Sequence, residues 1–150
     1  MAEYLANAVQ TVQLNEPVIF TASIPCTKGY VYHADETGVF ILKGITNNCF
    51  ARYQVNYDCN IAIPTGGTAG PIAVGITENG ELRPTSRAII TPAAVEEYQH
   101  VSGIAIITVP KGCCFQIALR AVSGVTDPTT DTPAPAILMQ NANLTITRIA

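Results

Sequence analysis

Side chains that could bind a metal ion come together at one place in the sequence. His33 and Asp35 stand two residues apart, so on a strand they would share one face, and Glu36 follows them in a turn. Imidazole and carboxylate groups are ordinary metal ligands, but one histidine with one or two carboxylates falls short of a recognised ligand set. We therefore expect an exposed polar edge here, with no metal and no cofactor.

The rest of the sequence contains no recognisable set of catalytic residues. Only His33 and His100 could serve as imidazole bases, and no Gly-x-Ser-x-Gly motif presents a nucleophilic serine. Glu96 and Glu97 are adjacent, so on a strand they diverge and cannot form the facing carboxylates of a glycosidase. The Gly-rich segment 64–71 lacks the Gly-Lys-Ser/Thr ending of a phosphate-binding loop. These patterns predict a protein that is not an enzyme.

The cysteines also give no recognisable site. There are five of them, an odd number without any Cys-x-x-Cys pair: Cys26, Cys49, Cys59, Cys113 and Cys114. This usage predicts neither a disulfide framework nor a zinc site. We expect most of them to be small buried apolar residues in a reducing compartment. A redox or intersubunit role is the alternative.

Composition then limits the classes of partner. Only 13% of the residues are charged, against about 25% in typical soluble domains, while 48% are hydrophobic. The eight Lys and Arg residues are scattered, which argues against nucleic-acid binding, and no apolar run reaches the about 20 residues of a membrane span. Residues 1–15 lack the apolar core of a secretory signal, so we expect synthesis and folding in the cytoplasm. Scarce charge predicts a surface covered by other copies or by an assembly.

The elements that would position these residues are strands. Short runs of alternating polarity, rich in Val, Ile, Thr, Tyr and Phe, are separated by Gly, Pro and Asn, which is typical of an all-β sandwich. We expect a single domain over residues 1–150. The predicted strands are residues 9–24, 29–34, 39–43, 49–58, 72–78, 81–90, 95–109, 113–122 and 142–149.

Turn chemistry and alternation add detail to this prediction. Hairpins are expected at Asn79-Gly80, at 35–38 and at 109–112, where Gly, Pro, Asn or Asp suit tight turns. Between Cys49 and Cys59, the odd-numbered positions Tyr53, Val55 and Tyr57 are expected to face the core.

Two segments do not fit the strand pattern. Residues 1–8 are a candidate N-terminal arm, either mobile or docked. Residues 123–136 carry three prolines and four threonines, which predicts a long exposed loop. This loop is either a plain surface excursion or a binding loop, whose candidate residues are Thr126, Asp127, Thr129, Thr130 and Asp131.

The strand pattern resembles a known family. With about nine or ten strands, a first run VQTVQLNEPVIFTAS and a closing run NANLTITRIA, the chain resembles the jelly-roll sandwich of two antiparallel sheets found in tumour-necrosis-factor and C1q-like domains. The stretches IAIPTGGTAGPIAV and ITPAAVEEYQHVSGIAIITVPKGCCFQIAL are similar to uncharacterised jelly-roll proteins of phages and prophages of gut Firmicutes.

This resemblance implies a homotrimer with one sheet of each subunit packed around the axis. It implies a phage virion structural protein, made in the bacterial host cytoplasm, that decorates the capsid or forms a head-fibre module. Such a protein binds the phage capsid protein and presents a surface to a host glycan or receptor. The alternative is an adhesion or coat module of the cell or spore surface. The trimer-facing candidates are Phe50, Tyr98, Gln116, Ala118, Asn143 and Thr145, with Tyr98 alternatively in the core.

Overall fold

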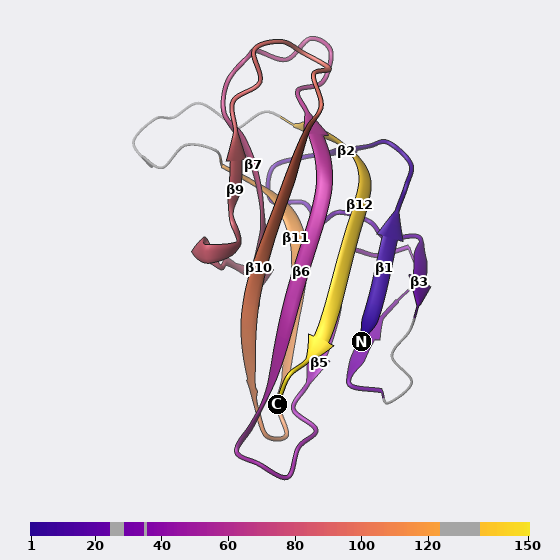
Figure 1. Ribbon diagram of the computed structural model, residues 1–150, viewed down its shortest axis with the longest axis vertical. Helices are drawn as coiled ribbons and strands as arrows, with labels where there is room; N and C mark the ends of the chain where they lie inside the picture. Colours follow the sequence, from indigo (N-terminus) through magenta and orange to yellow (C-terminus); the bar gives the residue numbers. More distant parts are fainter. Residues whose placement is uncertain (25–28, 35, 124–135) are drawn as a thin grey trace.

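Two antiparallel sheets face each other across a single core (Figure 1). The computed structural model describes residues 1–24, 29–34, 36–123 and 136–150. The first sheet, here the β6 sheet, has the order β10 (Gln99–Pro110), β6 (Phe50–Ala62), β12 (Ile137–Arg148), β1 (Ala2–Ala6) and β3 (Ala22–Ile24), and β2 (Gln10–Val12) also pairs with β12. The all-β prediction is confirmed.

The second sheet, here the β11 sheet, lies behind the first in Figure 1. Its order is β4 (Val31–His33), β5 (Phe40–Lys43), β11 (Cys114–Ser123), β7 (Ile72–Glu78) and β8 (Glu81–Leu82), and β9 (Ala88–Ile90) also pairs with β7. A single 3₁₀ turn, η1 (Pro84–Ser86), separates β8 from β9. Among the described residues, no helix is long and apolar enough to cross a membrane.

Alternating side chains from both sheets fill the core. Tyr53, Val55 and Tyr57 are buried, as their spacing predicts, and they belong to the same core cluster as Ile76 and Leu119 of the other sheet. Burial of each large apolar side chain contributes about 1.5–3 kcal/mol. The alternation therefore determines which face of each long strand packs inward.

The N-terminal part of the chain differs from the prediction. Of the two alternatives for residues 1–8, the structure shows the docked one, because β1 pairs with both β12 and β3 and buries Ala2, Tyr4 and Ala6. Residues 9–24 do not form one long strand. After β2 the chain crosses to the β11 sheet, where Val18 N–H donates to the Leu119 carbonyl at 2.8 Å. Asn15, with φ of 63°, makes the bend that this crossing needs.

Two of the three predicted hairpins are confirmed. At Asn79-Gly80 both residues have positive φ (51° and 89°), as a type I′ turn requires. Strands β4 and β5 pair around residues 36–38. The third prediction is wrong, because the turn at Pro110 joins β10 to β11, which belong to different sheets. A tight turn alone does not reveal whether the strands beside it pair.

The predicted strand 81–90 is interrupted at η1. Pro84 has no N–H for a sheet ladder and stands at the start of the 3₁₀ turn. The Ser86 hydroxyl replaces the lost pairing, because its Oγ accepts from Ile76 N–H at 2.9 Å and donates to the Arg83 carbonyl at 2.7 Å. At Ile76, between the stretches of β7 that pair with β8 and with β9, the Ser86 side chain therefore serves the N–H while the Arg83 backbone N–H donates to the carbonyl at 2.9 Å.

Candidate binding surfaces

The outer side of the β6 sheet carries an apolar and uncharged surface, here called the β6 face. It consists of two rows across three strands, Ile104, Asn56 and Thr145 in one row and Ile106, Gln54 and Thr147 in the next. Ile104 is 47% exposed and Ile106 is 41% exposed. The three strands lie side by side along the length of the molecule in Figure 1.

Three charged residues flank the two rows of the β6 face, and one of them, Glu3 of β1, continues the first row because it stands opposite Thr145. Asp58 lies beyond one row and Arg52 beyond the other, where the Arg52 guanidinium carbon is 4.8 Å from the centroid of the Phe50 ring. Polar side chains near these rows form hydrogen bonds with each other within the sheet. The Asn143 amide donates to Glu3 at 2.8 Å, and the Thr145 hydroxyl donates to Asn143 at 3.3 Å. Another molecule could cover this face without burying an unpaired charge.

The six trimer-facing candidates do not share one surface. Asn143 and Thr145 are half-buried on the outer side of β12, and Phe50 is exposed at the start of β6. Gln116 and Ala118 belong to β11 in the other sheet, whose outer side points away. The half-buried Tyr98 precedes β10. Ala118 is only 3% exposed in the single chain, so it cannot contribute appreciable contact area, and its assignment needs correction.

Sequence reasoning missed Ile104 and Ile106. Apolar residues occupy both sides of β10, with Val101, Ala105 and Ile107 buried, so alternation there does not distinguish the outer side. The signal that could have identified them is the pairing of β10 with β6, because Ile104 stands opposite the polar Asn56. The candidate binding-loop residues 126–131 lie outside the described residues.

His33 lies in an aromatic cluster. Its ring stacks on Phe40 with 4.3 Å between centroids and meets the edge of Tyr4 at 4.9 Å. Its Nε2 is 2.8 Å from the Thr37 carbonyl oxygen. Asp35 lies outside the described residues, and no group of three potential metal ligands occurs among the others. The contacts of His33 are those of a packed side chain.

The cysteines correct another expectation. Cys59 is buried in the core, where burial, aided by Asp58, raises the pKa of its thiol to about 12. The other three described cysteines are exposed: Cys49, Cys113 and Cys114. They stand near the turn that joins β10 to β11, where Lys111 N–H donates to the Cys49 carbonyl at 2.9 Å. Cys49 and Cys113 lie outside the strands beside this turn, and Cys114 is the exposed first residue of β11.

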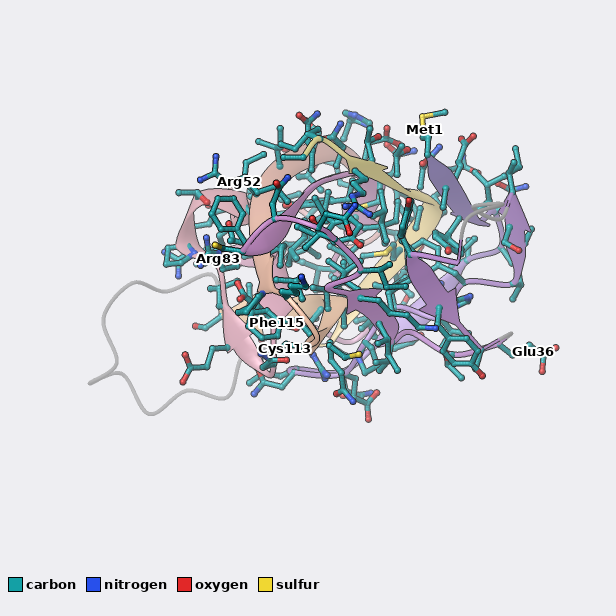
Figure 2. All side chains as sticks on the ribbon, turned by 90° about the horizontal axis from the view of Figure 1, so that it is seen from below. Met1, Glu36, Arg52, Arg83, Cys113 and Phe115 are labelled. Carbon is teal, nitrogen blue, oxygen red and sulfur yellow. The ribbon has the colours of Figure 1, made fainter. Side chains whose placement is uncertain are left out.

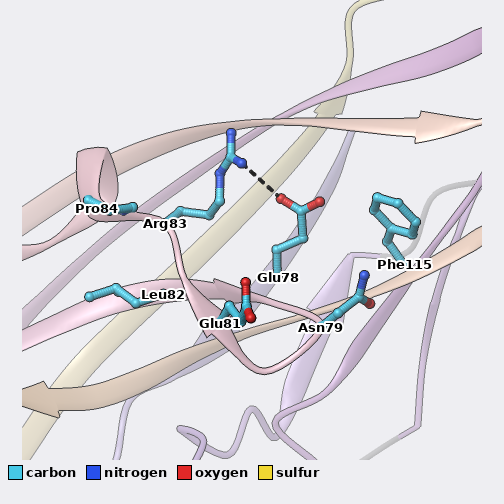
Figure 3. A pocket seen from close by; sticks show the side chains of 7 residues that line it. All are labelled: Glu78, Asn79, Glu81, Leu82, Arg83, Pro84 and Phe115. Carbon is cyan, nitrogen blue, oxygen red and sulfur yellow. Dashed lines mark ion pairs between the residues drawn. The ribbon is translucent and has the colours of Figure 1, made fainter.

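A hollow opens beside the β7–β8 hairpin, here called the hairpin pocket. Its volume is about 370 Å³, and its lining residues are Glu78, Asn79, Glu81, Leu82, Arg83, Pro84 and Phe115 (Figure 3). Arg83 Nη1 is 3.3 Å from Glu78 Oε2, and Nη2 donates to the Ile106 carbonyl of the opposite sheet at 3.2 Å. In Figure 2, Arg83 and Phe115 lie at the side of the molecule away from Met1 and Glu36.

Comparison with known proteins supports the architecture. No protein-family model and no curated protein matches the sequence. Among solved structures, the globular domain of zebrafish complement 1qA is similar, with 16% identity over 95% of this chain and 93% of that chain and a TM-score of 0.54. The fold is a C1q-like jelly roll. The C-terminal domain of EclA, a sugar-binding protein, also matches, with 16% identity over 95% of this chain and 80% of that chain and a TM-score of 0.41.

The C1q-like jelly roll thus confirms the resemblance inferred from the sequence at the level of the fold. The similarity to phage proteins stays a prediction. Within this jelly roll the β6 face and the hairpin pocket are separate surfaces, joined through β10, which carries Ile106 on one side and accepts from Arg83 at its edge.

Proposed function

We propose that this chain is a non-enzymatic structural module that forms a homotrimer through the β6 face. The observation that carries the proposal is the pair Ile104 and Ile106, side by side and nearly half exposed on a surface without charge at its centre. A threefold arrangement is what the sequence resemblance to tumour-necrosis-factor and C1q-like domains implies.

Energetics favour a second copy as the molecule that covers this face. Burying the exposed parts of two isoleucines contributes roughly 1.5–3 kcal/mol for each subunit. Asn56, Gln54 and Thr145 present amide and hydroxyl groups that can pair with the same groups of a copy. A charged partner surface would find no complementary charge within the two rows, whose nearest charges, Glu3, Arg52 and Asp58, stand at their ends.

We propose further that the trimer belongs to a phage virion, as a capsid decoration or head-fibre module that binds the capsid protein and displays a surface to the host. The scarcity of charge and the similarity of the quoted stretches to phage jelly-roll proteins support this role. The alternative is an adhesion or coat module of a cell or spore surface, which the same fold and the same β6 face would suit.

Two measurements test these proposals. Light scattering of the purified chain should give three times the chain mass of 15.9 kDa, and a monomer at micromolar concentration would contradict the trimer. Purified protein is then added to capsids of a candidate phage that lack it and imaged by electron cryomicroscopy. Threefold density on the shell supports the virion role, whereas a trimer that leaves all tested capsids bare favours the surface module.

A further inference from the structure

The hairpin pocket combines groups of opposite charge in a fixed arrangement. Glu78 and Glu81 stand directly opposite each other on β7 and β8, so their side chains share one face of the hairpin. Like charges at such positions repel, and Arg83 offsets this by its ion pair with Glu78. Among the residues that the structure describes, neither carboxylate forms any other ion pair. Glu81 therefore keeps its acceptor capacity for a ligand.

Arg83 is held in place from two sides. One guanidinium nitrogen contacts Glu78 Oε2 at 3.3 Å, and the other donates to the Ile106 carbonyl at 3.2 Å. The planar guanidinium has five N–H donors, so further donors remain for a ligand. A side chain tied in this way loses little conformational entropy when a ligand binds.

Asn79 is oriented just as firmly. Its backbone N–H donates to the Gln116 carbonyl at 2.7 Å, and its side-chain Oδ1 accepts from Gln116 N–H at 2.9 Å. The side-chain oxygen of Asn79 is thus hydrogen-bonded to β11, and its Nδ2 remains as a donor for a ligand. In Figure 3 Glu78 lies between Arg83 on one side and Phe115 on the other, with Asn79 beside the Phe115 ring.

Phe115 supplies an apolar wall. It is half-buried, packed against the core, and it lines the same pocket as the charged groups. The pocket volume of about 370 Å³ lies within the range of about 300–1,000 Å³ typical of small-molecule sites. A ligand seated here meets a ring face together with donors and acceptors.

We propose that the hairpin pocket binds a neutral saccharide. Sugar hydroxyls both donate and accept, so neighbouring hydroxyls can pair with a Glu78 oxygen and with an Arg83 N–H, while Glu81 and Asn79 serve the next positions. The C–H face of the sugar ring packs on the aromatic ring of Phe115. Two carboxylates oppose a polyanion, and the guanidinium already pairs with Glu78, so the lining recognises its ligand through hydrogen bonds and not through a strong net charge. This assignment rests on the proposed display function and gives it a site.

The test is a titration of isotope-labelled protein followed by amide NMR shifts. The probes are D-glucose, D-galactose, D-mannose and N-acetyl-D-glucosamine, compared with N-acetylneuraminic acid and putrescine. We expect at least one neutral sugar to shift residues 78–83 and 115–116 with a millimolar Kd. Absence of shifts with all four neutral sugars, or stronger binding of putrescine or the acidic sugar to these residues, would overturn the proposal.

Variants separate the site from the fold. Glu81→Gln and Phe115→Leu should each weaken sugar binding by about tenfold, while Glu97→Gln, an exposed carboxylate that does not line the pocket, should bind as the unaltered chain does. Unchanged affinity in both pocket variants would contradict the site. The mass from light scattering distinguishes the failure of this proposal from the failure of the proposed trimer. A trimer whose amide signals do not shift with any sugar refutes only the saccharide site. A monomer whose amide signals do shift refutes only the trimer.

Discussion

The hydroxyl of Tyr57 donates a hydrogen bond to the backbone carbonyl of Ser86, and so connects β6 of one sheet to the 3₁₀ turn beside β7 of the other. The Val74 carbonyl lies 3.3 Å from the same hydroxyl. The contact is buried, and burial raises the pKa of Tyr57 well above its usual range. The turn that carries Arg83 into the hairpin pocket is thereby attached to the core.

Replacing Tyr57 by phenylalanine tests this attachment. Tyr57→Phe keeps the ring but leaves the Ser86 carbonyl without its donor, which should lower the free energy of unfolding by about 1–3 kcal/mol. Urea denaturation measures the loss. Tyr30→Phe, in which a half-buried tyrosine outside this contact is changed, serves as the control and should shift the midpoint much less.

Gly103 of β10 leaves the space that the contact between Tyr57 and Ser86 needs. A Cβ atom at this position would lie 2.5 Å from both the Ser86 carbonyl oxygen and a ring carbon of Tyr57. Gly103→Ala should therefore destabilise the protein by about 1–3 kcal/mol through overpacking. Gly70→Ala, where a Cβ would meet nothing within 4 Å, should leave the unfolding midpoint nearly unchanged. Equal effects of the two variants would contradict this packing.

Alkaline pH should weaken the fold through Cys59. Its thiol has a pKa of about 12 in the folded chain and of 9.0 as its ordinary value, so the folded state retains the proton longer than the unfolded state. The stabilisation is complete below pH 9 and is lost as the pH rises toward 12. Between pH 9 and 10.5 the loss is about 2 kcal/mol. Urea midpoints across this range should fall less steeply in Cys59→Ala.

Thiol reactivity should divide the described cysteines into two groups. Cys49, Cys113 and Cys114 are exposed and should react with a maleimide in the native protein, whereas the buried Cys59 should react only after denaturation. Peptide mass spectrometry after brief labelling identifies the modified positions. Native labelling of Cys59 at the rate of Cys49 would contradict the burial described for β6.

The sequence predicts some of these features better than others. Alternation identifies the buried side of β6, because Tyr53, Val55 and Tyr57 are separated by polar residues. It cannot show that residues 13–18 leave one sheet for the other, since crossing depends on which edge is free for pairing. In β10 apolar residues occur on both sides, so the exposure of Ile106 becomes visible only once the strand is placed beside β6.

The hairpin pocket likewise contains residues that the sequence could predict and residues that it could not. The Asn79-Gly80 turn implies that Glu78 and Glu81 face each other, so half of the pocket could be predicted from the hairpin alone. Phe115 reaches it only because β11 pairs with β7, and Arg83 only because η1 turns the chain toward β10. Contacts between distant segments are decided by the packing of the two sheets, which local patterns do not encode.

A charge on the β6 face should dissociate the trimer. Ile106 and Ile89 are each 41% exposed, but Ile106 lies on the β6 face whereas Ile89 lies on β9 of the other sheet. Ile106→Lys would place an unpaired ammonium in the subunit contact, where burial of an unpaired charge costs several kcal/mol.

We expect Ile106→Lys to run as a folded monomer in light scattering, with an unchanged circular dichroism spectrum, because the side chain is outside the core. Ile89→Lys, with the same exposure and the same change of charge, should keep the mass of the unaltered protein. If both variants stay trimeric, the contact lies elsewhere than the β6 face. If Ile89→Lys alone dissociates, the β11 sheet forms the subunit interface.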